Sequence, residues 1–135
     1  MAMNEPRLGC GVVIVDGEAI LLVRRLHDPE AGCWGLPGRK VDWLEPVEDA
    51  VRREATEELD ITLGDLRLIC VVDQIDRLRG EHWVAPVYLA AGFKGEPRLV
   101  EPDKHAAFGW FALHGLPTPL TLATQQAVHA PSRGR

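Results

Sequence analysis

Apolar and polar positions along this chain predict mostly short strands. Two apolar runs, Gly9 to Val15 and Ala19 to Arg25, flank Asp16-Gly17, a dipeptide typical of two-residue hairpin turns. We therefore expect a β-hairpin in this region. Three further strand-like runs follow later in the chain, at residues 66–73, 83–93 and 108–113.

Two other segments have a helical pattern. Pro46 to Leu59 contains no glycine and no second proline, and Pro46 suits the first turn of a helix. Thr121 to Ala130 is a shorter candidate. From His27 to Trp43, proline and glycine recur often enough to predict a loop, with short extended pieces around Trp34 to Pro37. This mixture of strands and two helices favours an α/β or α+β fold with a mixed sheet.

Composition narrows the class of protein. Apolar residues make up 46% and charged residues 26% of the 135 residues, which is typical of one globular domain, residues 1–135, with polar residues 130–135 frayed. No run approaches the roughly 18 to 20 apolar residues of a membrane span, and the first residues lack a signal-peptide core. Three cysteines without C-x-x-C spacing suit a reducing compartment. We expect a cytoplasmic protein whose cysteines are buried small apolar residues.

The net charge of −5 comes from one segment. Lys and Arg number 15 and Asp and Glu number 20, while residues 45–60 alone hold seven acids and two bases, so the remainder is balanced at 13 against 13. This balance argues against a general nucleic-acid-binding surface. The acidic segment coincides with the predicted helix, which makes that helix the feature to explain.

Two of these acids fall on the apolar face of the helix. At about 100° per residue, Glu54 and Glu58 share an arc with Val51 and Leu59, and Glu57 lies at its edge. Burying unpaired carboxylates is costly, so compensating charge from an arginine or a bound cation is expected. Carboxylates at i, i+3 and i+4 favour a hard divalent cation such as Mg²⁺. The alternative is a solvated helix whose acids only keep the protein soluble.

The acidic helix belongs to a longer motif. Leu36 to Glu45 reads LPGRKVDWLE and Arg53 to Ile61 reads REATEELDI. Together they resemble the Nudix box of the Nudix (MutT-like) hydrolases, G-x5-E-x7-R-E-U-x-E-E-x-G-U, where U is a bulky aliphatic residue. All the carboxylates stand at the required offsets. Three positions depart from the pattern: Arg39 and Asp60 replace the two glycines, and Ala55 is a small aliphatic residue.

The resemblance implies an α/β/α sandwich around a central mixed β-sheet. It also implies hydrolysis of a nucleoside diphosphate linked to another group X, with Mg²⁺ or Mn²⁺ as the cofactor. Cations would screen the repulsion between an acidic protein and a polyanionic substrate and would activate a water. The matching positions imply these roles: metal ligands Glu57 and Glu58, a ligand or base Glu54, a ligand carbonyl Gly38, an outer ligand or helix-start residue Glu45, and an orienting Arg53.

Further contacts are expected outside the box. Glu101 or Asp103 is expected to complete the metal site, because a further acid from a distant loop often does so in this family. Phosphates are expected to meet Arg24 or Arg25, and Lys40. Stacking on a base is an alternative to a core position for three aromatic residues, Trp34, Trp83 and Phe108. The five histidines show no ligand spacing, so we expect none of them to bind a metal.

The sequence leaves several functions open. The first is a pyrophosphohydrolase that converts a (deoxy)nucleoside triphosphate to the monophosphate and pyrophosphate, favoured because the chain lacks the extra N-terminal segment of longer members. The second is a nucleotide-sugar or ADP-ribose hydrolase. A non-catalytic nucleotide sensor on the same fold would be favoured by a lost glutamate, and none is lost. A protein-interaction role for the acidic helix is the remaining option. The expected partner is a small nucleoside di- or triphosphate. We expect binding to neither nucleic acid nor a membrane, and a homodimer remains a possible assembly.

Overall fold

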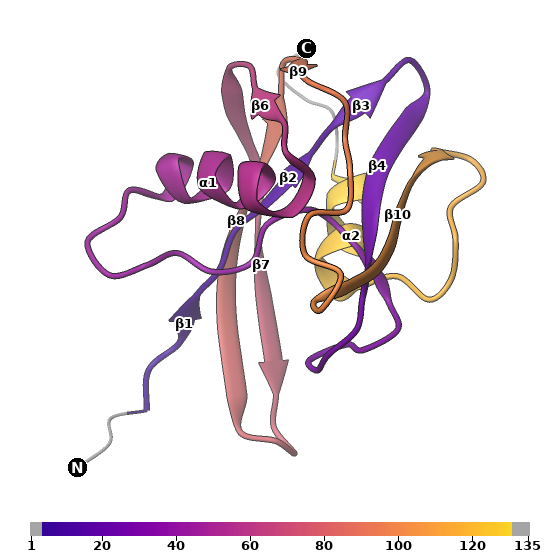
Figure 1. Cartoon of the computed structure of the whole chain (residues 1–135). Coiled ribbons are helices and arrows are strands. Elements are labelled where there is room, and N and C mark those ends of the chain that lie inside the picture. The colour runs from indigo at the N-terminus through magenta and orange to yellow at the C-terminus, as the bar shows by residue number, and fades with distance from the viewer. Residues whose placement is uncertain (1–3, 131–135) are drawn as a thin grey trace.

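The structure is a computed structural model, and it describes residues 4–130. Of the segment 130–135 that was expected to fray, residues 131–135 lie outside the described residues, and the N–H of Ala130 donates to the carbonyl of Ala127 at the end of α2. Within the described part of the chain, no helix is long and apolar enough to cross a membrane. The elements in chain order (Figure 1) are β1 Arg7–Leu8, β2 Gly11–Val13, β3 Val15–Asp16, β4 Ala19–Arg25, β5 Trp34–Gly35, α1 Val47–Leu59, β6 Thr62–Leu63, β7 Leu66–Asp76, β8 Glu81–Ala90, β9 Phe93–Lys94, β10 His105–Ala112 and α2 Leu122–His129.

Two four-stranded sheets form the centre of the fold. In the first sheet, β8 pairs in parallel with β1 and β2 and antiparallel with β7, so this sheet is mixed as expected. In the second sheet, β4 pairs antiparallel with β10, β3 and β5. The strand predicted over 83–93 ends at Ala90, and the separate β9 pairs with β6.

The predicted hairpin forms only in part. β3 and β4 pair across a two-residue turn at Gly17 and Glu18, one residue later than the expected Asp16-Gly17 turn. Gly17 has φ 63°, a conformation that glycine adopts freely. The earlier part of the run, β2, joins the other sheet through its parallel pairing with β8. That pairing is long-range in sequence, and an apolar run alone does not reveal its partner.

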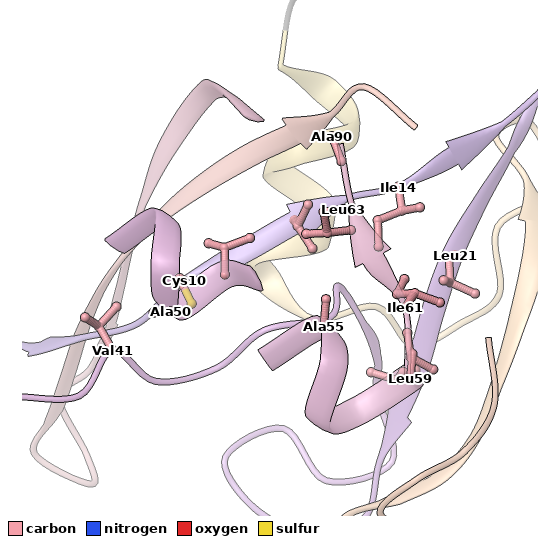
Figure 2. Close-up of a cluster of buried hydrophobic side chains, with 13 residues drawn as sticks. Cys10, Ile14, Leu21, Val41, Ala50, Ala55, Leu59, Ile61, Leu63 and Ala90 are labelled. Carbon is pink, nitrogen blue, oxygen red and sulfur yellow. The ribbon is translucent and has the colours of Figure 1, made fainter. Parts of the chain in front are cut away.

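Both faces of the central sheets are buried, which explains the continuous apolar runs. Neighbouring residues in a strand point to opposite faces: Val12 belongs to the core cluster beneath α1, and Val13 to the cluster beneath α2. Leu21 and Leu22 in β4 divide in the same way. One helix therefore covers each face, which confirms the α/β/α sandwich. Figure 2 shows the first cluster, where Ala50, Ala55 and Leu59 of α1 meet the strand residues Ile14 and Leu21.

Helix α1 begins one residue later than its proline. Pro46 occupies the N-cap position, with φ −62° and ψ 145°, rather than the first turn. Glu48 and Asp49 follow in the first turn, where negative charge complements the positive end of the helix dipole. Asp60 ends the helix in the left-handed region, with φ 59° and ψ 42°, as expected for the position where the motif has glycine.

The last turn of α1 is bonded to a distant loop. The N–H of Arg98 donates to the carbonyl of Leu59 at 3.1 Å, and the N–H of Val100 donates to the carbonyl of Glu58 at 3.2 Å. These bonds satisfy carbonyls that a helix end otherwise leaves without partners. They also place the loop that carries Glu101 beside the last turn of the helix.

Candidate active site

Two glutamates of α1 are turned into the protein. Glu54 is 9% exposed and Glu58 2% exposed, whereas the side chain of Glu57 is 48% exposed. This arrangement follows from helical phase, because residues four apart lie on one face. The structure thus excludes a fully solvated acidic helix, and it brings two carboxylates together under the sheet edge.

Glu58 is held by the loop between β5 and α1. The N–H of Gly38 donates to both carboxylate oxygens, at 3.3 and 3.2 Å. Gly38 has φ 110°, and a Cβ there would lie 2.7 Å from the carbonyl oxygen of Cys10, so only glycine fits. Burial raises the pKa of Glu58 well above its usual value of 4.5, and the neighbouring Glu54 raises it further. A cation at this carboxylate would remove that penalty.

One arginine organises the remaining acids. Arg53 bonds to Glu45 through Nε at 2.8 Å and Nη2 at 3.0 Å, and its Nη1 lies 2.9 Å from Glu57 and 3.4 Å from Glu54. These hydrogen bonds lower the pKa of Glu45 from 4.5 to about 2. Nη2 also donates to the carbonyl of Lys40 at 2.9 Å. Arg53 therefore links the loop to the helix, and Glu45 faces the arginine rather than the cleft.

His105 is a site residue that the sequence interpretation missed. Its Nε2 lies 3.8 Å from Oε1 of Glu58, and its side chain is 8% exposed. Its Nδ1 is buried without a hydrogen-bond partner among the described residues. Burial lowers the pKa of this histidine. No local spacing could have revealed it, because β10 reaches the site only by pairing with β4, where His105 stands opposite Arg25.

These residues line a cleft of about 770 Å³. Of the two loop acids considered, Glu101 lines the cleft and Asp103 does not; the carbonyl of Asp103 instead lies 2.7 Å from Nε2 of His27. No three of the described His, Cys, Asp and Glu side chains already enclose an ion-sized position. The charged lining consists of Arg7, Arg25, Arg39, Lys40, Asp42, Arg53, Glu54, Glu57, Glu58, Glu101 and Lys104.

The donor set nevertheless fits a divalent cation in kind. Hard cations take carboxylate and carbonyl oxygens, and Glu54, Glu57 and Glu58 supply the former on adjacent turns of one helix. Arg53 bonds to two of these three acids, and the buried Glu58 has no arginine or lysine within ion-pair distance among the described residues. Glu58 is thus the acid for which a cation would matter most.

A second, smaller cavity adjoins the cleft. It has a volume of about 90 Å³ and a mostly apolar lining that includes Leu36, Val87 and Ala123. Arg25, Arg39 and Trp83 line both cavities. Arg39, noted in the sequence only as a departure from the motif, is therefore a second residue whose place at the site was missed.

The remaining candidates have mixed outcomes. Arg24 is exposed, donates its Nε to the carbonyl of Gly32 and lines neither cavity. Trp34 packs edge-on against Phe111, with ring centroids 4.8 Å apart, and Phe108 packs on the first core cluster. All the cysteines are free, but the expectation that they are buried holds only for Cys10, since Cys33 and Cys70 are partly exposed.

Known proteins resemble this chain in sequence and in fold. The family model described as the NUDIX domain matches residues 5–131. The crystal structure of a MutT NUDIX hydrolase from Burkholderia pseudomallei superposes with a TM-score of 0.92, at 63% identity, over 95% of this chain and 99% of that one.

Two curated relatives point to different substrates. The ADP-ribose pyrophosphatase of Methanocaldococcus jannaschii is 33% identical over 84% of this chain and 66% of its own length. The putative 8-oxo-dGTP diphosphatase 2 of Mycobacterium tuberculosis is 36% identical over 72% of this chain and 67% of its own length. The chain thus spans about two thirds of the length of these relatives.

Proposed function

This chain belongs to the NUDIX domain family of hydrolases, and from that premise we propose that it cleaves a (deoxy)nucleoside triphosphate to the monophosphate and pyrophosphate with Mg²⁺ or Mn²⁺. The observation that carries the proposal is the buried Glu58 beside Glu54 on the wall of a cleft that also presents arginines and two lysines. Acids suit the cation, and bases suit a polyphosphate. The similarity to a putative 8-oxo-dGTP diphosphatase supports a triphosphate substrate.

The proposed roles follow the positions of the side chains. Glu57 and Glu58 would hold the cation, with Glu54 as a further ligand or as the base that takes a proton from water, and the carbonyl of Gly38 as a ligand from the loop. When bound, the cation would polarise a phosphoryl oxygen and activate water for attack on phosphorus. Glu101 would add an acid from the loop that is bonded to the last turn of α1.

Other groups are proposed to position the ligands or the substrate. Arg53 orients Glu57 and fixes the loop through Glu45, so we assign Glu45 to the start of the helix rather than to the metal. Lys40 and Arg25 line the cleft and suit phosphate oxygens. A cytoplasmic location stays part of the proposal, supported by the free cysteines.

The second candidate activity is hydrolysis of ADP-ribose. It is favoured by the similarity to the archaeal ADP-ribose pyrophosphatase, at 33% identity. Both substrates contain a nucleoside attached to a diphosphate, so the cleft would act on the same type of bond. The two substrates differ in the group beyond the diphosphate, and the identity of the products therefore distinguishes the two activities.

A substrate panel tests the proposal. The purified protein is incubated with Mg²⁺ and, separately, each dNTP, 8-oxo-dGTP, ATP, GTP, ADP-ribose and a nucleotide sugar, and the products are separated by ion-exchange chromatography. Monophosphate and pyrophosphate in equal amounts are expected from a triphosphate. Glu58→Gln, purified in the same way, controls for contaminating enzymes. Release of only inorganic phosphate, or no turnover of any member of the panel, would contradict the proposed activity.

A further inference from the structure

The two cavities meet at a pair of arginines. Arg25 and Arg39 line both the larger cleft and the smaller, mostly apolar cavity, together with Trp83. A ligand that reaches from one cavity into the other must pass these guanidinium groups. The pair therefore occupies the position at which the two ends of a substrate would be joined.

Arg25 is fixed in place, and the nearest carboxylates, Glu30 and Glu58, act on its charge only from beyond ion-pair distance. It ends β4, where its N–H donates to the carbonyl of Cys33 at 2.9 Å and its carbonyl accepts from Gly32 at 2.8 Å. Its Nε donates to the carbonyl of Pro29 at 2.8 Å, which orients the guanidinium. Within residues 4–130, its two terminal nitrogens have no hydrogen bond and no ion pair. Burial lowers the pKa of Arg25, and the charge of Arg39 lowers it further.

Arg39 comes from the loop between β5 and α1. Its carbonyl accepts from the N–H of Cys10 at 3.1 Å, and the adjoining Lys40 forms a β-bridge with Gly9, so its backbone is anchored. Its side chain is exposed and makes no hydrogen bond or ion pair with the described residues. The Nudix motif has glycine at this position, so the second guanidinium is a feature of this chain and not of the motif.

Two unpaired guanidinium groups near each other repel, and the cheapest compensation is an anion between them. Glu30 also lines the smaller cavity, but its carboxylate accepts the N–H of Leu122 at 2.8 Å and forms no ion pair with Arg25. Guanidinium groups match phosphate oxygens with paired hydrogen bonds. The smaller cavity is mostly apolar, and the cleft carries the carboxylates of α1. A phosphate held between the two arginines would therefore have different surroundings on its two sides.

We propose that Arg25 and Arg39 together clamp the phosphate that is bonded directly to the nucleoside, with the nucleoside toward the smaller cavity and the scissile anhydride toward α1. The proposal rests on the proposed function for the identity of the ligand as a nucleotide. The clamp is built from protein cations alone. Nucleoside monophosphate binding therefore requires no metal, and Arg39 sets affinity for the nucleotide rather than for the metal.

Calorimetric titration in the presence of a chelator tests this directly. The probes are dGMP, AMP, adenosine and inorganic pyrophosphate. The variant is Arg39→Gln, which keeps most of the side-chain length and removes the charge. The control is Arg77→Gln, which removes an exposed guanidinium in the turn between β7 and β8 that lines neither cavity. Melting temperatures check that both variants fold.

The expected result is that dGMP or AMP binds the unaltered protein, that Kd rises about ten- to a hundredfold in Arg39→Gln, and that Arg77→Gln binds as before. The Kd of adenosine, which has no phosphate, should be the same in Arg39→Gln as in the unaltered protein. An unchanged Kd in Arg39→Gln overturns the proposal, and so does absence of monophosphate binding without metal. A variant that weakens pyrophosphate but not monophosphate binding also overturns it. If Arg39-dependent binding is found but no substrate is hydrolysed with Mg²⁺, the clamp stands and the proposed activity fails.

Discussion

Arg53 and Glu45 are joined by two parallel hydrogen bonds, Nε to Oε2 at 2.8 Å and Nη2 to Oε1 at 3.0 Å. The arginine lies in α1 and the glutamate precedes the helix, so the pair fastens the loop to the helix. The same guanidinium bonds to Glu57. Loop position and carboxylate position at the candidate site are therefore set by one side chain.

Arg53→Lys should lower the midpoint of urea unfolding even though it keeps the charge. Lysine is a compact point charge and cannot make the paired bonds to Glu45 while also reaching Glu57. A double-mutant cycle with Glu45→Gln should be non-additive, because either change alone already breaks the pair. Additive effects of the two substitutions would show that the pair does not couple the loop to the helix.

Glu57→Gln and Glu58→Gln should each lower kcat at least about a hundredfold, because each removes a charged ligand from a cation that stabilises transition-state charge. Steady-state rates at saturating Mg²⁺ measure the effect. Glu48→Gln is the matched control, since Glu48 is an exposed acid in the first turn of the same helix. Near-normal turnover in both Glu57→Gln and Glu58→Gln would show that α1 does not form the active site.

Mg²⁺ or Mn²⁺ should raise the melting temperature. A cation that binds only the folded protein stabilises it by about 2.7 kcal/mol at a hundred times its Kd. The comparison is between excess metal and chelator at matched ionic strength, for the unaltered protein and for Glu58→Gln. The shift should be largely lost in the variant. Equal shifts in both proteins would place the bound cation elsewhere.

The contribution of Glu58 to the stability of the metal-free protein should fall as the pH rises above about 4.5, whereas His105, whose pKa is lowered by burial, makes a contribution of opposite sign. Burial raises the pKa of Glu58 in the folded protein, so the folded state holds a proton that the unfolded state releases above about pH 4.5. The free energy of unfolding then falls as the pH rises through the raised pKa. Glu45, whose pKa is lowered to about 2, changes charge below this window. Urea unfolding at several pH values in chelator should show that the unaltered protein loses more stability with rising pH than Glu58→Gln does, and an identical pH dependence of the two proteins would refute the assignment.

Asp60→Gly should stabilise the fold, but by only about 0.5 kcal/mol. Glycine removes the cost of the left-handed conformation, roughly 0.5 to 1 kcal/mol, and removes an acid from the negative end of the helix. The substitution also breaks the exposed pair between Asp60 and Nε of Arg98 at 3.0 Å, worth up to about 1 kcal/mol. In an Arg98→Ala background the gain in the free energy of unfolding should be larger, because the pair between Asp60 and Arg98 is already absent. Denaturant unfolding of the four proteins measures both values, and a smaller gain in that background would contradict this account.

The sequence was most informative where the determinants are local. Helical phase placed Glu54 and Glu58 on the buried face of α1, and motif spacing marked Asp60 as the helix end. Both follow from residues within a few turns of one another. The partner of β2 could not be predicted in this way, because the parallel pairing with β8 joins segments far apart in the chain.

The same limit applies to the site. His105 reaches Glu58 only because β10 pairs with β4, and Arg39 meets Arg25 only because the loop between β5 and α1 comes near the end of β4 at the two cavities. Arg24 and Arg25 looked equivalent in the sequence, and strand alternation alone separates them, since neighbouring side chains of β4 point to opposite faces. A one-dimensional pattern shows which residues share an element and not which elements meet.

The backbone bonds from Arg98 and Val100 to the last turn of α1 have a mechanical consequence. They tie the loop before Glu101 to the last turn of the helix, which also carries Glu58. Amide hydrogens of Arg98 and Val100 should then exchange with solvent at the pace of the helix end rather than at that of a surface loop. The position of Glu101 relative to Glu58 is thereby constrained by main-chain hydrogen bonds and not by side-chain contacts alone.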